Sequence, residues 1–174
     1  ARRDNSPPWP MGIPRLRFPA GAPSRSTLKL EEAFLQLLDA QERETLLHPG
    51  MRAVDLGAAP RGWTYQLVRR HLRVVAVDNG AIDAALLESG LVEHQRVDGF
   101  RYWPVRPVDW MVCDIVEQPR RIADLAARWH GCGRLGYAIT PRFAPSCSER
   151  SSSASRSMVS MTAWAAATAS GFAA

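Results

Sequence analysis

The chain has 174 residues, of which 46% are hydrophobic and 22% are charged, enough for one globular domain with a buried core. Its net charge of +5 and isoelectric point near 9.7 favour an anionic partner such as nucleic acid. No apolar run approaches the ~18 residues that a spanning helix needs, and Cys113, Cys132 and Cys147 have neither disulfide nor zinc spacing. We therefore expect a cytoplasmic protein, monomeric and without a metal.

The first segment, residues 1–25, contains six prolines and several arginines. Proline fixes φ and removes a hydrogen-bond donor, so this composition predicts an extended basic arm rather than a helix. A linker and a segment that faces nucleic acid are both open interpretations.

One amphipathic helix is predicted over residues 27–46, with Ser26 or Thr27 as its amino cap. Its apolar stripe recurs at i, i+4, i+7 and i+8 (Leu30, Phe34, Leu37 and Leu38). Lys29, the only lysine of the chain, lies off this stripe in the first turn. A lysine there is mildly unfavourable for the helix dipole, so it is either an ordinary solvated residue or part of a site.

Strands and helices alternate after a turn at residues 48–50. The expected strands are 51–56, 73–77, 94–97, 108–113 and 135–139, and the expected helices are 63–70, 82–89 and 119–130. Such alternation predicts an α/β fold with a mostly parallel sheet between two layers of helices.

Small residues and spaced acids indicate a cofactor site. A Gly-Ala-Ala-Pro loop begins at Gly57, directly after the first expected strand, and Asp78 follows 21 residues later. That offset is close to the ~20 residues at which an acid meets a ribose in nucleotide sites. Asp78, Asp98 and Asp114 each close an expected strand, so their carboxylates should lie on one rim of the sheet. One such aspartate is an ordinary turn residue, but three beside this loop fit adenosine binding.

Five segments resemble motifs of the FtsJ-type RNA 2′-O-ribose methyltransferases. They are residues 26–30 (Ser-Thr-Leu-Lys-Leu), 55–64 (Asp-Leu-Gly-Ala-Ala-Pro-Arg-Gly-Trp-Thr), 77–80, 98–100 and 110–114. Residues 9–16 and 116–119 narrow the resemblance to bacterial members that methylate a cytidine of large-subunit (23S) ribosomal RNA. The resemblance covers about residues 5–139. It implies a Rossmann-like fold, S-adenosylmethionine (SAM) as cofactor and ribosomal RNA as partner.

The resemblance also implies site residues. By position, SAM would be surrounded by Ser26, Ala59, Pro60, Arg61, Gly62, Asp78, Asp98 and Asp114. The family's catalytic set is Lys-Asp-Lys-Glu, and Lys29 and Asp114 match its first two members.

Two departures from the family pattern bear on activity. The second lysine is expected just after residue 139, where the chain has Thr140-Pro141-Arg142-Phe143, and the glutamate has no counterpart. A guanidinium stays protonated and cannot act as a base, so catalysis by this chain should be impaired. Arg61 stands where the family has glycine. It either strains the loop and brings a cation to the cofactor, or points harmlessly to solvent or RNA phosphate.

The last segment, residues 141–174, is rich in serine and alanine and has no periodic pattern. This predicts disorder, or at best a loosely docked helix near 161–169. The abrupt change is typical of translation in a shifted frame, which would truncate the sheet at its carboxyl edge. The expected organisation is an arm (1–25), a methyltransferase domain (26–140) and a tail (141–174).

Two other functions compete with methyl transfer. A non-catalytic RNA- or SAM-binding module would use the basic arm (Arg2, Arg3, Arg15, Arg17 and Arg25). A dinucleotide oxidoreductase is least favoured, because the loop at Gly57 lacks G-x-G-x-x-G spacing and contains Pro60.

Overall fold

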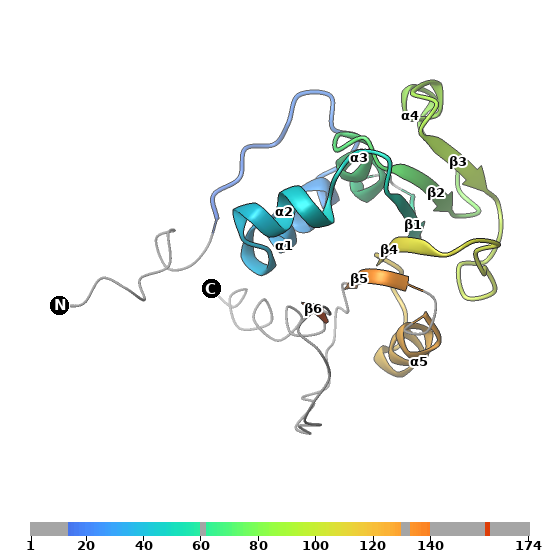
Figure 1. Cartoon of the computed structure of the whole chain (residues 1–174). Coiled ribbons are helices and arrows are strands. Elements are labelled where there is room, and N and C mark those ends of the chain that lie inside the picture. Colours follow the sequence, from blue (N-terminus) through green and yellow to red (C-terminus); the bar gives the residue numbers. More distant parts are fainter. Residues whose placement is uncertain (1–13, 60–61, 130–132, 140–158, 161–174) are drawn as a thin grey trace, which may run out of the picture.

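The computed structural model describes residues 14–59, 62–129, 133–139 and 159–160 (Figure 1). Its strands are β1 (Arg52–Leu56), β2 (Arg73–Val77), β3 (Val92–Gln95), β4 (Val108–Cys113), β5 (Gly133–Ile139) and β6 (Val159–Ser160). They form one sheet in the order β3-β2-β1-β4-β5-β6, and every pair of neighbours is parallel. The chain order reverses between β1 and β4, which is where doubly wound sheets bind ligands at the carboxyl ends of their strands.

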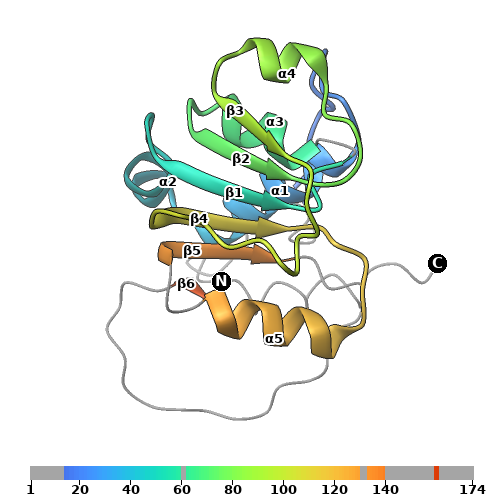
Figure 2. The same ribbon diagram turned by 90° about the vertical axis from the view of Figure 1, so that its right-hand side faces the viewer.

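Helices cover both faces of this sheet, as predicted for a three-layer α/β/α sandwich. They are α1 (Ser26–Leu37), α2 (Ala40–Leu46), α3 (Gly62–Val68), α4 (Ala84–Glu88) and α5 (Pro119–Trp129). Helices α1, α2 and α3 lie on one face, and α5 lies on the other (Figures 1 and 2). The Rossmann-like fold predicted from the sequence is confirmed by this topology.

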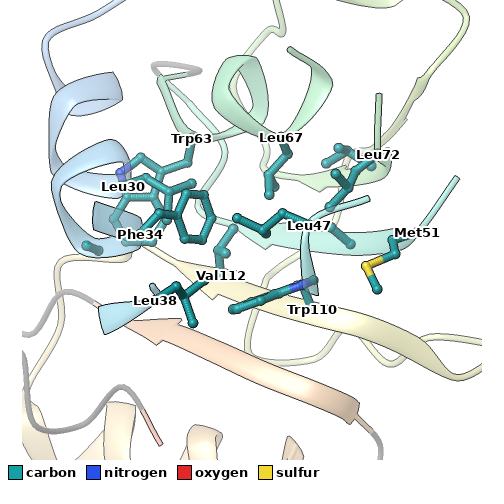
Figure 3. Close-up of a cluster of buried hydrophobic side chains, with 13 residues drawn as sticks. Leu30, Phe34, Leu38, Leu47, Met51, Trp63, Leu67, Leu72, Trp110 and Val112 are labelled. Atoms are coloured by element: carbon teal, nitrogen blue, oxygen red, sulfur yellow. The ribbon is translucent and has the colours of Figure 1, made fainter. Parts of the chain in front are cut away.

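In the core on the α1 side of the sheet, the Trp110 side chain of β4 contacts both α1 and α2. Trp110 of β4 packs edge-on against Phe34 of α1, with ring centroids 5.7 Å apart (Figure 3). Its indole Nε1 donates to the Leu46 carbonyl oxygen of α2 at 2.6 Å. The opposite face of the sheet packs on α5 through a second cluster that includes Met111, Cys113 and Leu125. Alternate residues of β4 thus serve the two faces.

The predicted helix over 27–46 is wrong as a single element. It breaks at Leu38, and Asp39 starts α2 with a capping box in which Asp39 and Glu42 bond each other's backbone N–H. The predicted cap at Ser26 or Thr27 is also wrong, because Arg25 occupies that position and makes no side-chain cap bond. The apolar stripe continued across the break, so periodicity alone did not reveal it.

The strand predicted at 94–97 is β3, which lies two residues earlier and ends at Gln95. Asp98 is therefore three residues past the strand rather than next to it. The mixed sequence of β3, with Glu93 and Gln95 facing away from α4, gave no clear pattern for its boundary.

The terminal segments are only partly described. Residues 14–25 contain turns but no helix or strand, and residues 1–13 of the predicted arm lie outside the described residues. Within the predicted tail only β6 is described, and its parallel pairing with β5 was not predicted. The predicted disorder and the possible helix near 161–169 otherwise fall outside the described residues. No helix in the described ranges is long and apolar enough to cross a membrane.

Candidate functional site at the carboxyl rim of the sheet

Two of the three predicted aspartates directly follow their strands, and the backbone fixes them on one rim. The Asp114 N–H donates to the Leu56 carbonyl oxygen at 3.2 Å, and the Asp78 N–H donates to that of Gln95 at 3.2 Å. Asp98 lies farther along its loop, with an exposed side chain that accepts from the Phe100 N–H at 2.9 Å. The adjacent Gly99 nevertheless packs on Leu56 and Ile115, which brings this loop to the same rim.

The Asp78 carboxylate joins the loop after β1 to the loop after β2. Oδ2 accepts from the Ala59 N–H at 3.1 Å, and Oδ1 accepts from the Gly80 N–H at 2.6 Å. A carboxylate has about four acceptor positions, so two remain for a ligand hydroxyl pair. The chain thus places a preorganised acceptor beside a turn of small residues, which is the arrangement that ribose recognition needs.

The turn after β1 depends on glycine at Gly57. Its φ is +78°, a region that side chains rarely occupy. An added Cβ would also lie 2.7 Å from Cγ1 of Ile115, below any normal contact. Ile115 therefore fills the space between Gly57 and Gly99, and the loop can turn only because neither residue carries a side chain.

The start of α3 lies against the start of α1. A Cβ at Gly62 would lie 2.1 Å from the Ser26 Oγ, so any side chain there would push the two helices apart. Trp63 Nε1 donates to the Ser26 carbonyl oxygen at 3.1 Å, which locks this approach. Ser26 is thus held against the start of α3, and its predicted contact with the cofactor stays a prediction. Pro60 and Arg61 lie outside the described residues.

Lys29 and Asp114 form an ion pair between residues that are 85 positions apart in the chain. Lys29 Nζ lies 3.2 Å from Oδ1 and 3.3 Å from Oδ2 of Asp114. The lysine side chain is 41% exposed and the aspartate 19%, so the pair is open to solvent on one side. The ion pair brings the Lys29 ammonium to the rim while its side chain stays partly exposed to solvent, so a role of Lys29 in a site stays a prediction.

Asp55 belongs to the same region but was not predicted as a site residue. It is the acidic side chain in the middle of β1, fully buried, and its Oδ2 accepts from Thr64 Oγ1 at 2.7 Å. Its Oδ1 has no hydrogen-bond partner among the described residues. Burial raises the pKa of Asp55 to about 7, opposed by the Thr64 bond and supported by the charges of Asp114 and Asp78. A charged residue inside an apolar strand was the available sequence signal.

Fold and site together define an α/β domain built to bind a nucleotide-type cofactor at the switch point of its sheet. The family model of FtsJ-like methyltransferases matches residues 22–128, and the chain belongs to this family. Several curated relatives are similar over about four fifths of the chain.

The relative from Methylococcus capsulatus, named ribosomal RNA large subunit methyltransferase M, is 67% identical over 78% of this chain and 38% of its own length. Relatives with the same name from Azoarcus sp. and Azotobacter vinelandii are 59% and 63% identical, over 38% and 39% of their lengths. The chain therefore spans somewhat over a third of the relatives that it matches. A Burkholderia thailandensis methyltransferase solved with S-adenosylhomocysteine is a remote match, 17% identical over 73% of this chain and 65% of that chain, with a TM-score of 0.42.

Proposed function

We propose that this chain binds SAM at the carboxyl rim and directs methyl transfer to a ribose 2′-hydroxyl of large-subunit ribosomal RNA, at a cytidine. The single observation that carries the proposal is the Lys29–Asp114 ion pair, which brings an ammonium and a carboxylate together beside the Asp78 loops. Membership in the FtsJ-like methyltransferase family and the names of the relatives support it.

The residues at the rim fit SAM. Asp78 retains two acceptor positions for the ribose hydroxyls after bonding both loops. Asp98, whose side chain is half-exposed and lies 3.9 Å from the Arg101 Nε, offers a carboxylate for the adenine amino group. Ser26, Ala59 and Gly62 border the remaining side, and Pro60 and Arg61 are assigned to it from their position in the sequence alone. The carboxylates of Asp78 and Asp114 face the single ammonium of Lys29 here, and the negative charge that remains favours a cationic sulfonium.

When bound, SAM supplies an electrophilic methyl group for displacement by a ribose oxygen. The O–C bond forms as the C–S bond breaks, and the hydroxyl proton must leave the nucleophile. Lys29 and Asp114 present a donor and an acceptor 3.2 Å apart at the place proposed for that hydroxyl. In this assignment Lys29 stabilises the charge that develops on the oxygen, and Asp114, which orients the lysine, would accept the hydroxyl proton.

Lys29 is the only lysine in the chain, and this observation favours a second candidate function. Without the second lysine of the family's catalytic set, proton removal depends on Lys29 and Asp114 alone. The chain would then bind SAM and RNA but transfer methyl groups slowly or not at all. A non-catalytic RNA- and SAM-binding module is therefore the alternative.

The decisive experiment compares the parent chain with Lys29→Ala for transfer of labelled methyl groups from SAM to ribosomal RNA. We expect the variant to lose whatever transfer the parent shows, by roughly 10²–10³-fold, because the cation that stabilises the developing charge is removed. Calorimetric titration with S-adenosylhomocysteine should give similar heats for both proteins. Lys29→Arg, which keeps the charge but changes its geometry, should not restore the rate.

The outcomes separate the candidates. Transfer that survives in Lys29→Ala contradicts the assigned catalytic role. Binding of S-adenosylhomocysteine without any transfer by the parent supports the non-catalytic module. No detectable heat from the folded parent with either SAM or S-adenosylhomocysteine contradicts the cofactor proposal itself.

A further inference from the structure

A cavity of about 520 Å³ lies at the opposite end of the strands from the proposed methyl-transfer site. Arg52 and Arg73, the first residues of β1 and β2, line it, and so does Val108, which begins β4. Tyr102 and Arg106, from the connection between β3 and β4, line it as well. Because β1 has five residues, the cavity lies roughly 16 Å from the rim along the strand.

The sheet places two guanidinium groups side by side in this cavity. Arg52 and Arg73 are directly paired in the parallel register of β1 and β2. Both side chains are exposed, and alternation along the strands puts them on the same face of the sheet. Like charges at such positions destabilise a sheet, so a folding role alone does not account for this pair.

The positive charge of the cavity is only partly offset by nearby carboxylates. Among the described residues, no carboxylate lies within ion-pair distance of the side chains of Arg52, Arg73 and Arg106. Glu93 is the acidic residue in the lining, and its carboxylate accepts a hydrogen bond from the Gln95 side chain instead. The Asp109 carboxylate, next to Val108, accepts from the Arg52 backbone N–H at 2.8 Å. Three cations therefore face two carboxylates that both already have hydrogen-bond partners.

The remaining lining favours a nucleotide rather than a bare ion. Ala53, Val75, Pro104 and Val108 give the cavity apolar walls, which strengthen charge interactions inside it. Its volume falls within the ~300–1,000 Å³ range of small-ligand sites. Guanidinium forks match the oxygens of phosphate in bidentate geometry. The Tyr102 ring also lines the cavity, and because one of its faces stacks on Trp129, a sugar or base could pack only against the other.

We propose that this cavity is a second RNA contact, in which Arg52, Arg73 and Arg106 hold the phosphates of the substrate strand away from the nucleotide that is methylated. The RNA identity rests on the function proposed above, whereas the anion-binding chemistry rests on the cavity itself. A strand that reaches both places spans roughly five nucleotides at the ~3.4 Å rise per nucleotide of a helical strand. The site would thereby fix the register of the substrate.

The test measures the anisotropy of a fluorescein-labelled single-stranded RNA over a range of salt concentrations. The cavity variant is Arg52→Gln with Arg73→Gln. The matched control is Arg69→Gln with Arg120→Gln, which removes the same charge from exposed residues outside the cavity lining. Unlabelled cytidine monophosphate serves as a competitor, to distinguish an RNA strand from a free nucleotide.

We expect the cavity variant to bind RNA about tenfold or more weakly, because charged hydrogen bonds are lost. Its salt slope should fall by about 1.4, or ~0.7 for each phosphate contact removed. The control should change much less. The thermal midpoint of the cavity variant should not fall, since its substitutions relieve a like-charge pair.

Equal weakening in the cavity variant and the control would overturn the proposal, because net charge would then explain both. Binding of cytidine monophosphate as tight as that of RNA would overturn the RNA assignment. Calorimetry with S-adenosylhomocysteine reports separately on the proposed function, because no cavity residue lies at the rim. Loss of that signal in the parent chain would therefore leave the cavity result interpretable.

Discussion

The pKa of Asp55 is set mainly by burial and, to a smaller extent, by the neighbouring carboxylates of the rim. Its carboxyl group is fully buried, bonded at one oxygen to Thr64, and its pKa is raised to about 7. The folded state therefore holds this proton more tightly than the unfolded chain, for which the ordinary value is 3.8. The stability that this difference contributes is complete below the unfolded value and is lost as the pH rises through about 7. Two nearby carboxylates, Asp114 and Asp78, act in the same direction.

We expect Asp55→Asn to flatten the pH dependence of stability between pH 4 and pH 7, the interval that the raised pKa defines. The amide oxygen can still accept from Thr64, but the side chain no longer titrates. Urea unfolding at several pH values should show the parent losing a few kcal/mol across this interval relative to the variant. The absolute stability at acid pH is a weaker test, because the new NH₂ group is buried and needs its own partner. Parallel curves for the two proteins would contradict the assignment of the raised pKa to Asp55.

At the scale of elements, the site depends on how β1 ends and α3 begins. Gly57 turns the chain with a positive φ, and Gly62 lets α3 approach α1. Between them the backbone N–H of Ala59 is held by Asp78. Local backbone geometry also explains why α1 and α2 are two separate helices. The capping box at Asp39 satisfies the orphan N–H groups of a new helix start and redirects the chain.

Gly57→Ala should destabilise the protein by about 2–5 kcal/mol, since backbone strain and a close contact with Ile115 add together. Gly90→Ala is the matched control. Gly90 also has a positive φ, +69°, but a Cβ there meets no atom within 4 Å, so it should lose only about 1 kcal/mol. Urea denaturation of both variants separates the two costs. Equal losses would show that strain alone matters and that Ile115 yields to the added methyl group.

At the scale of the molecule, the carboxyl ends and the amino ends of the strands carry side chains of opposite charge. The carboxyl rim collects Asp78, Asp98 and Asp114, while the amino ends of β1 and β2 present Arg52 and Arg73. Helix α1 connects to the central strand β4 through both Lys29 at the rim and Phe34 in the core. The integrity of the site therefore depends on the same packing that stabilises the fold.

Substitutions at Trp110 test whether the fold depends on the packing between β4, α1 and α2. We expect Trp110→Phe to cost about 1–3 kcal/mol, because the Leu46 carbonyl loses its donor while most of the apolar packing remains. Trp110→Ala should cost about 3–5 kcal/mol through the cavity that it leaves. Trp103→Phe, at an aromatic side chain that is 49% exposed, is the control and should change stability little. Urea unfolding followed by circular dichroism measures all three. A control as unstable as Trp110→Phe would contradict the central position of Trp110.

Much of the arrangement was predictable from local pattern. The strands 51–56, 73–77, 108–113 and 135–139 are confirmed within a residue or two, because buried parallel strands are short apolar runs between turns. Asp78 and Asp114 follow those strands directly, so their place on one rim was predictable as well. The end of β3 and the break before Asp39 were not, since neither changes the hydrophobic period.

The sequence by itself determined the parallel α/β fold, the loop at Gly57 and the acids beside it, because these depend on spacing along the chain. Only the tertiary structure decided which distant groups meet. It brought Lys29 to Asp114 across 85 positions and set the buried environment that raises the pKa of Asp55. It also placed Arg52 opposite Arg73. The physical reason is that contact, burial and charge depend on distances in space, which the sheet register and helix packing set and which no local pattern encodes.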